Sequence, residues 1–485
     1  MSGVVDITPE SPGDAAITPA PPRKRSLKEM MLHGSSWSIV EYGGSQALRF
    51  LSNVLLAGII NDPVIFGVNV IVAVFMQGIS MFSDLGIGQS IIQSKRGSDP
   101  KFLDTAWTMQ IIRGVCFSLV SALLAWPVSR IYDNETVLYA LPLAGMAGLI
   151  EGFNSTKLYL LNRDVRLGRL AAINIGTQVI AIIGTLIFAY FSRTVYALIA
   201  GALLSSLVRM IASHQFCPGP ANRIAWDRAS KYELLHFGKW IFFSTLFGFL
   251  ASRGDQLLMG WYMPIAMFGA YGIAVFLKDG LVQGMHHISQ RVLFPLYARI
   301  AEETPAELRR QTYRVRAVLM ALSVPPVCVL VVWGQDIVGL FYPDKFQETG
   351  WMLQILSAGA IVSVIGSTVG PVLLAMGDSY RFMIMQGTRT VLMCVTMFVG
   401  GYAGALIGNA VLTPVIAQPD YFAPLAASFW NHGSMVGVLI GVTLPELFLY
   451  PVLVWAVRRY NVWLPKLDFA GLVLAIVLIT LGFAI

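Results

Sequence analysis

Charged residues are scarce in this sequence. Asp, Glu, Lys and Arg make up 13% of the 485 residues, whereas 56% are hydrophobic. Because soluble domains carry about 25% charged residues, this composition excludes an ordinary soluble fold. The apolar runs reach the roughly 20 residues that a helix needs to cross a bilayer, and they lack the alternation of barrel strands. The chain is therefore expected to be an all-α polytopic membrane protein.

Cysteine and histidine are also rare, and neither is arranged as a metal site. The four cysteines are scattered along the chain: Cys116, Cys217, Cys328 and Cys394. Most fall inside apolar helices, so they are interpreted as small core residues rather than as a disulfide framework or metal ligands. The adjacent His286 and His287 point to different faces of a helix and are not expected to bind a metal together.

No hydrophilic segment is long enough to fold as a separate soluble domain. Residues 1–33 are rich in Pro, Gly and small side chains, which predicts a disordered cytosolic tail that ends in a basic anchor. No apolar stretch precedes the basic cluster, so this tail is not expected to be a signal peptide.

Thirteen apolar segments are predicted to be membrane helices. They cover residues 36–60, 65–90, 103–126, 136–160, 168–191, 194–214, 235–262, 266–292, 314–341, 350–376, 380–404, 430–457 and 468–485. The segment 405–420 is expected to be a loop or re-entrant. A cytosolic linker at 217–233 divides the first twelve spans into two six-helix bundles, 34–216 and 234–457. Residues 458–485 would add an extra C-terminal membrane helix.

The basic residues predict how the chain is oriented. With the N-terminus in the cytosol, 25 of the 34 Lys and Arg residues, including Arg316, fall in cytosolic segments. The external loops then hold three, Arg130, Arg193 and Lys345. Cytoplasmic loops of membrane proteins carry such an excess. The net charge of +7 is therefore expected to face the anionic cytoplasmic leaflet rather than nucleic acid.

An internal repeat relates the two predicted bundles. Residues 53–78 align without a gap with residues 255–280, and seven of the 26 aligned pairs are identical. The identities include three glycines and a Phe-Gly pair. Six spans separate the two copies, so the halves run in the same direction and are expected to be related by an axis along the membrane normal. Transporters with parallel repeats place their substrate path between such halves.

Charged residues within the predicted spans are the candidate functional residues. A charge at the bilayer centre costs roughly 2.5 to 3.5 kcal/mol on insertion scales, so these side chains must face one another or a watery cavity. The basic residues are Arg49, Arg113, Arg253, Lys278 and Arg389. The acidic residues are Asp84, Glu151, Asp255, Asp279 and Glu446.

Two interpretations of these charges are open. They pair internally and serve only the fold, or they line a cationic cavity between the halves. Arginine binds phosphate oxygens through a planar fork of donors, so such a cavity suits a multiply anionic ligand such as a diphosphate. The acids would then carry a coupling H⁺ or Na⁺, and no other cofactor is expected. The close spacing within Arg253/Asp255 and Lys278/Asp279 does not suit a pair on one helix face, so separate partners are expected.

Three sequence stretches and the six-plus-six layout resemble a known family. The stretches are SDLGIGQSIIQ at 83–93, DTAWTMQIIRG at 104–114 and RGDQLLMGWYMPIAMFGAYGIA at 253–274. Together they resemble the polysaccharide-transport family, the Wzx-type flippases of the multidrug, oligosaccharidyl-lipid and polysaccharide exporter superfamily. The resemblance covers roughly residues 30 to 460.

The resemblance implies a fold and a function. It implies two pseudo-symmetric bundles in a V-shaped arrangement, with one or two extra C-terminal helices. It implies a non-enzymatic transporter in the bacterial inner membrane that flips an undecaprenyl-diphosphate-linked oligosaccharide to the outer leaflet. This export would serve exopolysaccharide, capsule or O-antigen synthesis by ion-driven alternating access. The five basic residues would lie near the diphosphate, and a polymerase and glycosyltransferases of the same pathway would be partners alongside membrane lipids.

Two alternative functions are considered beside this one. A multidrug and toxin antiporter of the same superfamily would expel organic cations, and its cavity should be acidic and aromatic. A membrane-embedded glycan polymerase or ligase would need a sizeable external loop, whereas the predicted external loops are short and poor in Arg and His. The identity of the glycan is not readable from these residues.

Overall fold

The computed structural model describes residues 27–484 with short gaps. The gaps are Leu85, Val165, 301–304, 367–368, Gly377, 411–422 and Asn461, and within the helices some side chains, chiefly those of 27–39, 233–247, 285–308, 405–410 and 423–434, also lie outside the description. The expected disordered tail at 1–33 is therefore mostly outside the described residues. Its last part, 27–33, is helical, which corrects the predicted boundary.

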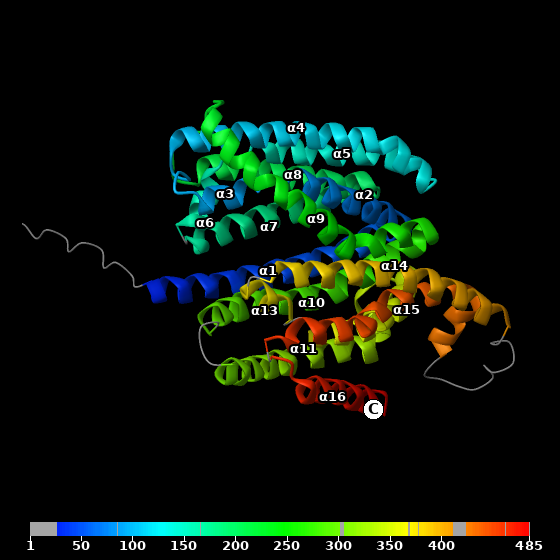
Figure 1. The fold of residues 1–485 in the computed structure, drawn as a ribbon. Helices are drawn as coiled ribbons and strands as arrows, with labels where there is room; N and C mark the ends of the chain where they lie inside the picture. Colours follow the sequence, from blue (N-terminus) through cyan, green and yellow to red (C-terminus); the bar gives the residue numbers. More distant parts are fainter. Residues whose placement is uncertain are drawn as a thin grey trace, which may run out of the picture.

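The described residues are helical and contain no strand (Figure 1). The helices of the first half are α1 (Leu27–Ile60), α2 (Pro63–Ser83), α3 (Ile87–Gln93), α4 (Pro100–Ile131), α5 (Glu135–Gly152), α6 (Lys157–Arg163), α7 (Leu167–Phe191) and α8 (Val195–Gln215). Those of the second half are α9 (Arg228–Tyr262), α10 (Ile265–Ile300), α11 (Pro305–Phe341), η1 (Asp344–Phe346), α12 (Glu348–Gly366), α13 (Val369–Ala375), α14 (Ser379–Ala410), α15 (Ala423–Arg458) and α16 (Pro465–Ala484).

Each of the thirteen predicted spans corresponds to a helix or a bent helix pair. Ten helices in the described part of the chain are long and apolar enough to cross a membrane, and the pair α5–α6, bent by 65°, raises this to eleven. The predicted spans 36–60 and 235–262 correspond to α1 and α9. The chain is thus an all-α polytopic membrane protein.

Three predicted spans are interrupted where a single helix was expected. The segment 65–90 ends as a helix at Asp84, whose carboxylate accepts a hydrogen bond from the backbone N–H of Gly86 at 3.0 Å. Gly86 has φ of 63°, a left-handed conformation that glycine adopts without steric cost, and α3 begins after it. The segments 136–160 and 350–376 likewise divide into α5–α6 and α12–α13. Local turn chemistry therefore overrides the continuous apolar pattern.

Two other boundaries differ from the expectation. Helix α14 continues to Ala410, so the first part of the expected loop at 405–420 is helical, and 411–422 lies outside the described residues. The linker between the halves is shorter than 217–233 because α9 begins at Arg228. It is also held against α4, where Asp104 accepts a hydrogen bond from the backbone of Arg223 at 2.9 Å.

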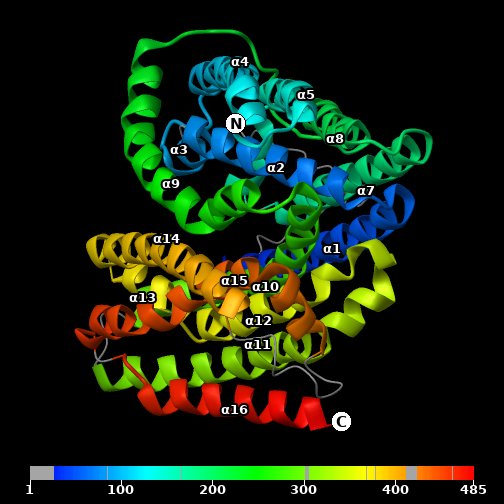
Figure 2. The same cartoon turned by 90° about the vertical axis from the view of Figure 1, so that its right-hand side faces the viewer.

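The two halves of the chain lie side by side (Figure 2). Helices α1 to α8 form one group and α10 to α16 the other, while α9 contacts α2 and α4 of the first group and α14 of the second. Helix α16 packs on the outer side of α11 and α12. Large apolar side chains such as Leu123 and Phe191 are exposed on the outer surface, as expected for a lipid-facing protein.

Helices α2 and α10 cross closely at their first turns. A Cβ atom added to Gly67 would overlap the carbonyl oxygen of Ile265, and one added to Gly269 would overlap that of Pro63. In the 202-residue repeat, Gly67 corresponds to Gly269 and Pro63 to Ile265. The two contacts are therefore reciprocal, which agrees with the twofold relation predicted by the repeat. Phe66 and Phe268 of the same crossing belong to one apolar core that is shared by both halves.

Candidate functional site

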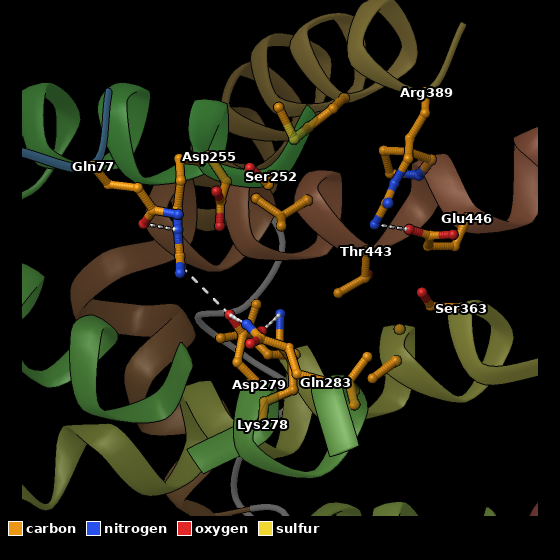
Figure 3. A pocket seen from close by; sticks show the side chains of 18 residues that line it. Gln77, Ser252, Asp255, Lys278, Asp279, Gln283, Ser363, Arg389, Thr443 and Glu446 are labelled. Atoms are coloured by element: carbon orange, nitrogen blue, oxygen red, sulfur yellow. Dashed lines mark hydrogen bonds and ion pairs between the residues drawn. The ribbon is translucent and has the colours of Figure 1, made fainter. Parts of the chain in front are cut away.

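Two adjoining cavities lie near the contact between the halves, the first formed mainly by helices of the second half and the second by helices of both halves. The first has a volume of about 420 Å³ and is lined by residues of α2, α9, α10, α12, α14 and α15 (Figure 3). The second, of about 280 Å³, is lined by residues of α1, α2, α9 and α10. Gln77, Arg253, Asp279 and Gln283 line both cavities, so these four side chains form the boundary between them.

Arg253 is held at this boundary by two partners. Its Nε donates to Oε1 of Gln77 at 2.8 Å, and its Nη1 lies 3.4 Å from Oδ2 of Asp279. Lys278 also contacts Asp279, with Nζ 3.1 Å from Oδ1. Because the three charged side chains are only about one-fifth exposed, this is a partly buried network rather than a surface contact. The prediction that Lys278 and Asp279 need separate partners is wrong, because the long side chain of Lys278 reaches the carboxylate of its sequence neighbour Asp279.

Asp255 and Arg253 do have separate partners, as the sequence spacing predicted. The carboxylate of Asp255 is buried, and its Oδ2 accepts a hydrogen bond from the hydroxyl of Tyr271 at 2.6 Å. Both residues come from the helices that form the boundary, α9 and α10. Asp255 still faces the first cavity, as Figure 3 shows.

Arg389 and Glu446 form an ion pair on the other side of the first cavity. Nη2 of Arg389 on α14 lies 2.5 Å from Oε1 of Glu446 on α15 (Figure 3). The side chain of Arg389 is 36% exposed, so its outer edge remains open to the cavity. The sequence named both residues as candidates but not their pairing, because no local spacing connects them.

The first cavity is not the net cationic site that the sequence predicts. Its described lining balances three basic residues against three acidic ones, Arg253, Lys278 and Arg389 against Asp255, Asp279 and Glu446. Arg49 adds an exposed guanidinium to the second cavity. Over both cavities the basic residues exceed the acidic ones by one. Arg253, Lys278 and Arg389 are therefore paired with carboxylates and also line the first cavity.

The remaining candidates do not line these two cavities. Arg113 and Glu151 line a separate cavity of about 150 Å³ between α4, α5 and α6. Glu151 also lines a further cavity of about 330 Å³, which adjoins the second cavity at Asn69 and Gln77. The guanidinium of Arg113 donates to the hydroxyl of Ser83 and to the carbonyl of Ser80, each at 3.2 Å. Asp84 forms the turn before α3 and is not among the residues lining the described cavities. The sequence grouped these residues with the others because they lie within predicted spans. That position does not show which face of the helix a side chain occupies.

Sequence reasoning also missed a buried ion pair far from the cavities. Arg316, expected in a cytosolic segment, lies inside α11 and is 4% exposed. Its Nη2 donates to Asp468 of α16 at 2.7 Å and to the carbonyl of Ile365 at 3.1 Å. The hydroxyl of Tyr450 donates to the other oxygen of Asp468 at 3.0 Å. The signal in the sequence was Asp468, an acidic residue in the first turn of the apolar helix α16, which needs a basic partner when it is buried.

Comparison with known proteins agrees with this architecture. A family model described as polysaccharide biosynthesis protein matches residues 55–350. The chain is 23% identical over 391 residues to the lipopolysaccharide biosynthesis protein WzxC of Escherichia coli, covering 79% of this chain and 77% of that protein. It is 21% identical over 345 residues to the teichuronic acid biosynthesis protein TuaB of Bacillus subtilis, covering 70% of each.

Solved structures resemble the fold over nearly the whole chain. The lipid II flippase MurJ in an inward closed conformation has a TM-score of 0.61, at 12% identity and 92% coverage of both chains. An outward-facing multidrug resistance MATE family transporter of the MOP superfamily has a TM-score of 0.57, at 15% identity, covering 90% of this chain and 96% of that chain.

The chain is thus a polytopic membrane protein with the fold of these flippase and transporter structures. Within that class, the chain belongs to the polysaccharide biosynthesis protein family, because the family model covers more than half of its length. The family predicted from the three sequence stretches is confirmed.

Proposed function

We propose that this protein flips an undecaprenyl-diphosphate-linked oligosaccharide from the cytosolic to the outer leaflet of the bacterial inner membrane. The observation that carries the proposal is the convergence of Arg253, Lys278 and Arg389 in one cavity, which helices of the second half form together with Gln77 of the first. These cations come from three helices, and each also has an acidic partner. A diphosphate can replace those carboxylates, since both ligands offer oxygens to the same donors.

The acidic partners favour release of the substrate, because they compete with the diphosphate for the basic side chains. When the diphosphate leaves, Asp279 pairs again with Arg253 and Lys278 and Glu446 with Arg389, which reduces the uncompensated positive charge of the empty cavity. Transport by alternating access requires the empty protein to return to the conformation that accepts substrate, so the empty cavity must be stable. We assign the protein this transport cycle and no catalytic step.

Asp255 is the residue that we assign to ion coupling. It is buried beside the first cavity, accepts a hydrogen bond from Tyr271, and has no basic partner among the described residues. Protonation or binding of Na⁺ would remove an unpaired charge from the membrane interior. The N-terminus is placed in the cytosol on the distribution of basic residues alone. A polymerase and glycosyltransferases of the same pathway are the proposed partners.

The test is a deletion strain complemented with the wild-type protein or with variants. Arg253→Gln is expected to lower surface polysaccharide and to leave lipid-linked precursor on the cytosolic side. Asp336→Asn, which changes an exposed charge outside the described cavities, serves as a control at equal membrane level. Normal polysaccharide in the deletion strain, together with increased drug sensitivity, would instead support a multidrug antiporter.

A further inference from the structure

The second cavity has an unusual lining of carboxamide side chains. Six of them face it, from α1, α2, α9 and α10: Gln46, Asn53, Asn69, Gln77, Gln256 and Gln283. The first cavity contains only the two that both cavities share, and its other polar groups are mainly charged. The two cavities thus differ in chemistry although they adjoin.

Half of these amides form no hydrogen bond with the residues that the structure describes. Asn53 accepts from Tyr342 and Gln77 from Arg253, while Gln283 donates to Asp279 at 3.4 Å. In the part of the chain that the structure describes, the other three amides form no hydrogen bond. These three are Gln46, Asn69 and Gln256.

An amide without a partner is costly inside a membrane protein. Burial of such a group without a hydrogen bond is unfavourable, because the group loses its hydrogen bonds to water. Gln256 is only 6% exposed, so the cavity is where its hydrogen bonds must be made. The cavity is therefore built for a polar occupant.

The chemistry of that occupant follows from the donor and acceptor set. A carboxamide offers both donors and an acceptor, as does a hydroxyl group, so a cluster of amides matches a molecule with many hydroxyls. Phe66 and Phe276 add apolar surface to the same cavity, which suits the C–H faces of a sugar ring. A bare phosphate would instead favour cations, of which the first cavity has three and the second has Arg49 and the shared Arg253.

We propose that the second cavity is a saccharide subsite that holds the sugar units next to the diphosphate. This inference rests on the proposed function and specifies which part of the substrate lies where. In such a substrate the first sugar is bonded directly to the diphosphate, and the two cavities share four lining residues. The volume of about 280 Å³ is near the lower end of the roughly 300 to 1,000 Å³ usual for ligand pockets, so the second cavity by itself has room for the proximal sugars. A further cavity of about 330 Å³ adjoins it at Asn69 and Gln77.

Binding of two ligands to the full-length protein in lipid nanodiscs tests the subsite. The ligands are bare undecaprenyl diphosphate and the lipid-linked glycan extracted from cells that lack this protein. The double variant Asn69→Leu/Gln256→Met keeps side-chain volume but removes hydrogen bonds. Its affinity for the glycan-bearing lipid should fall about tenfold, since two hydrogen bonds are lost, while its affinity for the bare lipid is unchanged. Gln46→Met is a second variant in case the double variant does not fold.

Two further variants separate the possible outcomes. Arg253→Gln should weaken binding of both ligands, and Gln215→Met, at the exposed end of α8, should change neither. Equal losses for both ligands in the amide variants, or no loss for either, would overturn the saccharide subsite and leave a water-filled vestibule. If the wild-type protein binds neither ligand, or if the deletion accumulates no lipid-linked glycan, the proposed function itself is wrong.

Discussion

Gln77 and Asp279 occupy equivalent positions of the two repeats, and both bind the guanidinium of Arg253. One repeat copy offers a neutral amide and the other a carboxylate, so the symmetric backbone carries an asymmetric charge. Arg253 itself has no basic counterpart at the equivalent position, Leu51. The boundary between the cavities thus follows the repeat, but two side-chain differences between the copies make its charge asymmetric.

The first prediction concerns the fork geometry of Arg253. Arg253 contacts Gln77 through Nε and Asp279 through Nη1, two nitrogen atoms of the planar guanidinium. Arg253→Lys keeps the positive charge but has a single nitrogen atom at the end of its side chain. We expect Arg253→Lys to lower the rate of precursor export about tenfold and Arg253→Gln about a hundredfold, from losses of roughly 1.5 to 3 kcal/mol per charged hydrogen bond. Export is measured as surface polysaccharide against cytosolic-side precursor. Full activity of the lysine variant would show that charge alone suffices.

The second prediction concerns the crossing of α2 and α10. Gly67→Ala and Gly269→Ala each place a methyl group against backbone of the other helix, so the crossing must open. Overpacking of this kind costs about 1 to 3 kcal/mol, and the melting temperature should fall accordingly. Gly58→Ala is the matched control, because no atom lies within 4 Å of its added Cβ. Equal melting temperatures in all three variants would contradict the close crossing.

The third prediction concerns the attachment of α16. Arg316→Met leaves the carboxylate of Asp468 buried without its cation, which should destabilise the protein by about 3 to 5 kcal/mol. Adding Asp468→Leu removes the unpaired charge, so the double variant should recover much of the loss. Thermal unfolding of the purified variants measures both effects. A double variant less stable than Arg316→Met would mean that the ion pair is not the cause.

The fourth prediction concerns the start of α9, outside the membrane. Hydrogen bonds from the hydroxyl and backbone of Ser230 lower the pKa of Asp227, and Arg96 lowers it further. A lowered folded-state pKa contributes stability above the unfolded pKa, near 3.9, and that contribution disappears as the pH falls through the folded value. Asp227→Ala should therefore be less stable than wild type at pH 7, and the difference should shrink in acid. A difference that does not depend on pH would exclude a role for the charge.

The sequence by itself determined the class of protein, the approximate positions of its long helices and the repeat. Apolar length fixes which segments enter the bilayer, and this property is local to each segment. The sequence also identified Arg253, Lys278 and Arg389 as charged residues within the membrane, because each lies inside an apolar segment. The breaks at Gly86 and between α5 and α6 were not predicted, because turns made by a few residues are weak signals beside long apolar runs.

Only the tertiary structure decided which charges meet. Arg389 and Glu446 are paired across two helices, whereas Arg113 and Glu151 lie in a different cavity from Arg253. The amide-lined cavity was also invisible in the chain, since its side chains come from four helices and share no spacing. Depth in the membrane is set along each helix, but the face a residue presents depends on how that helix packs against the others.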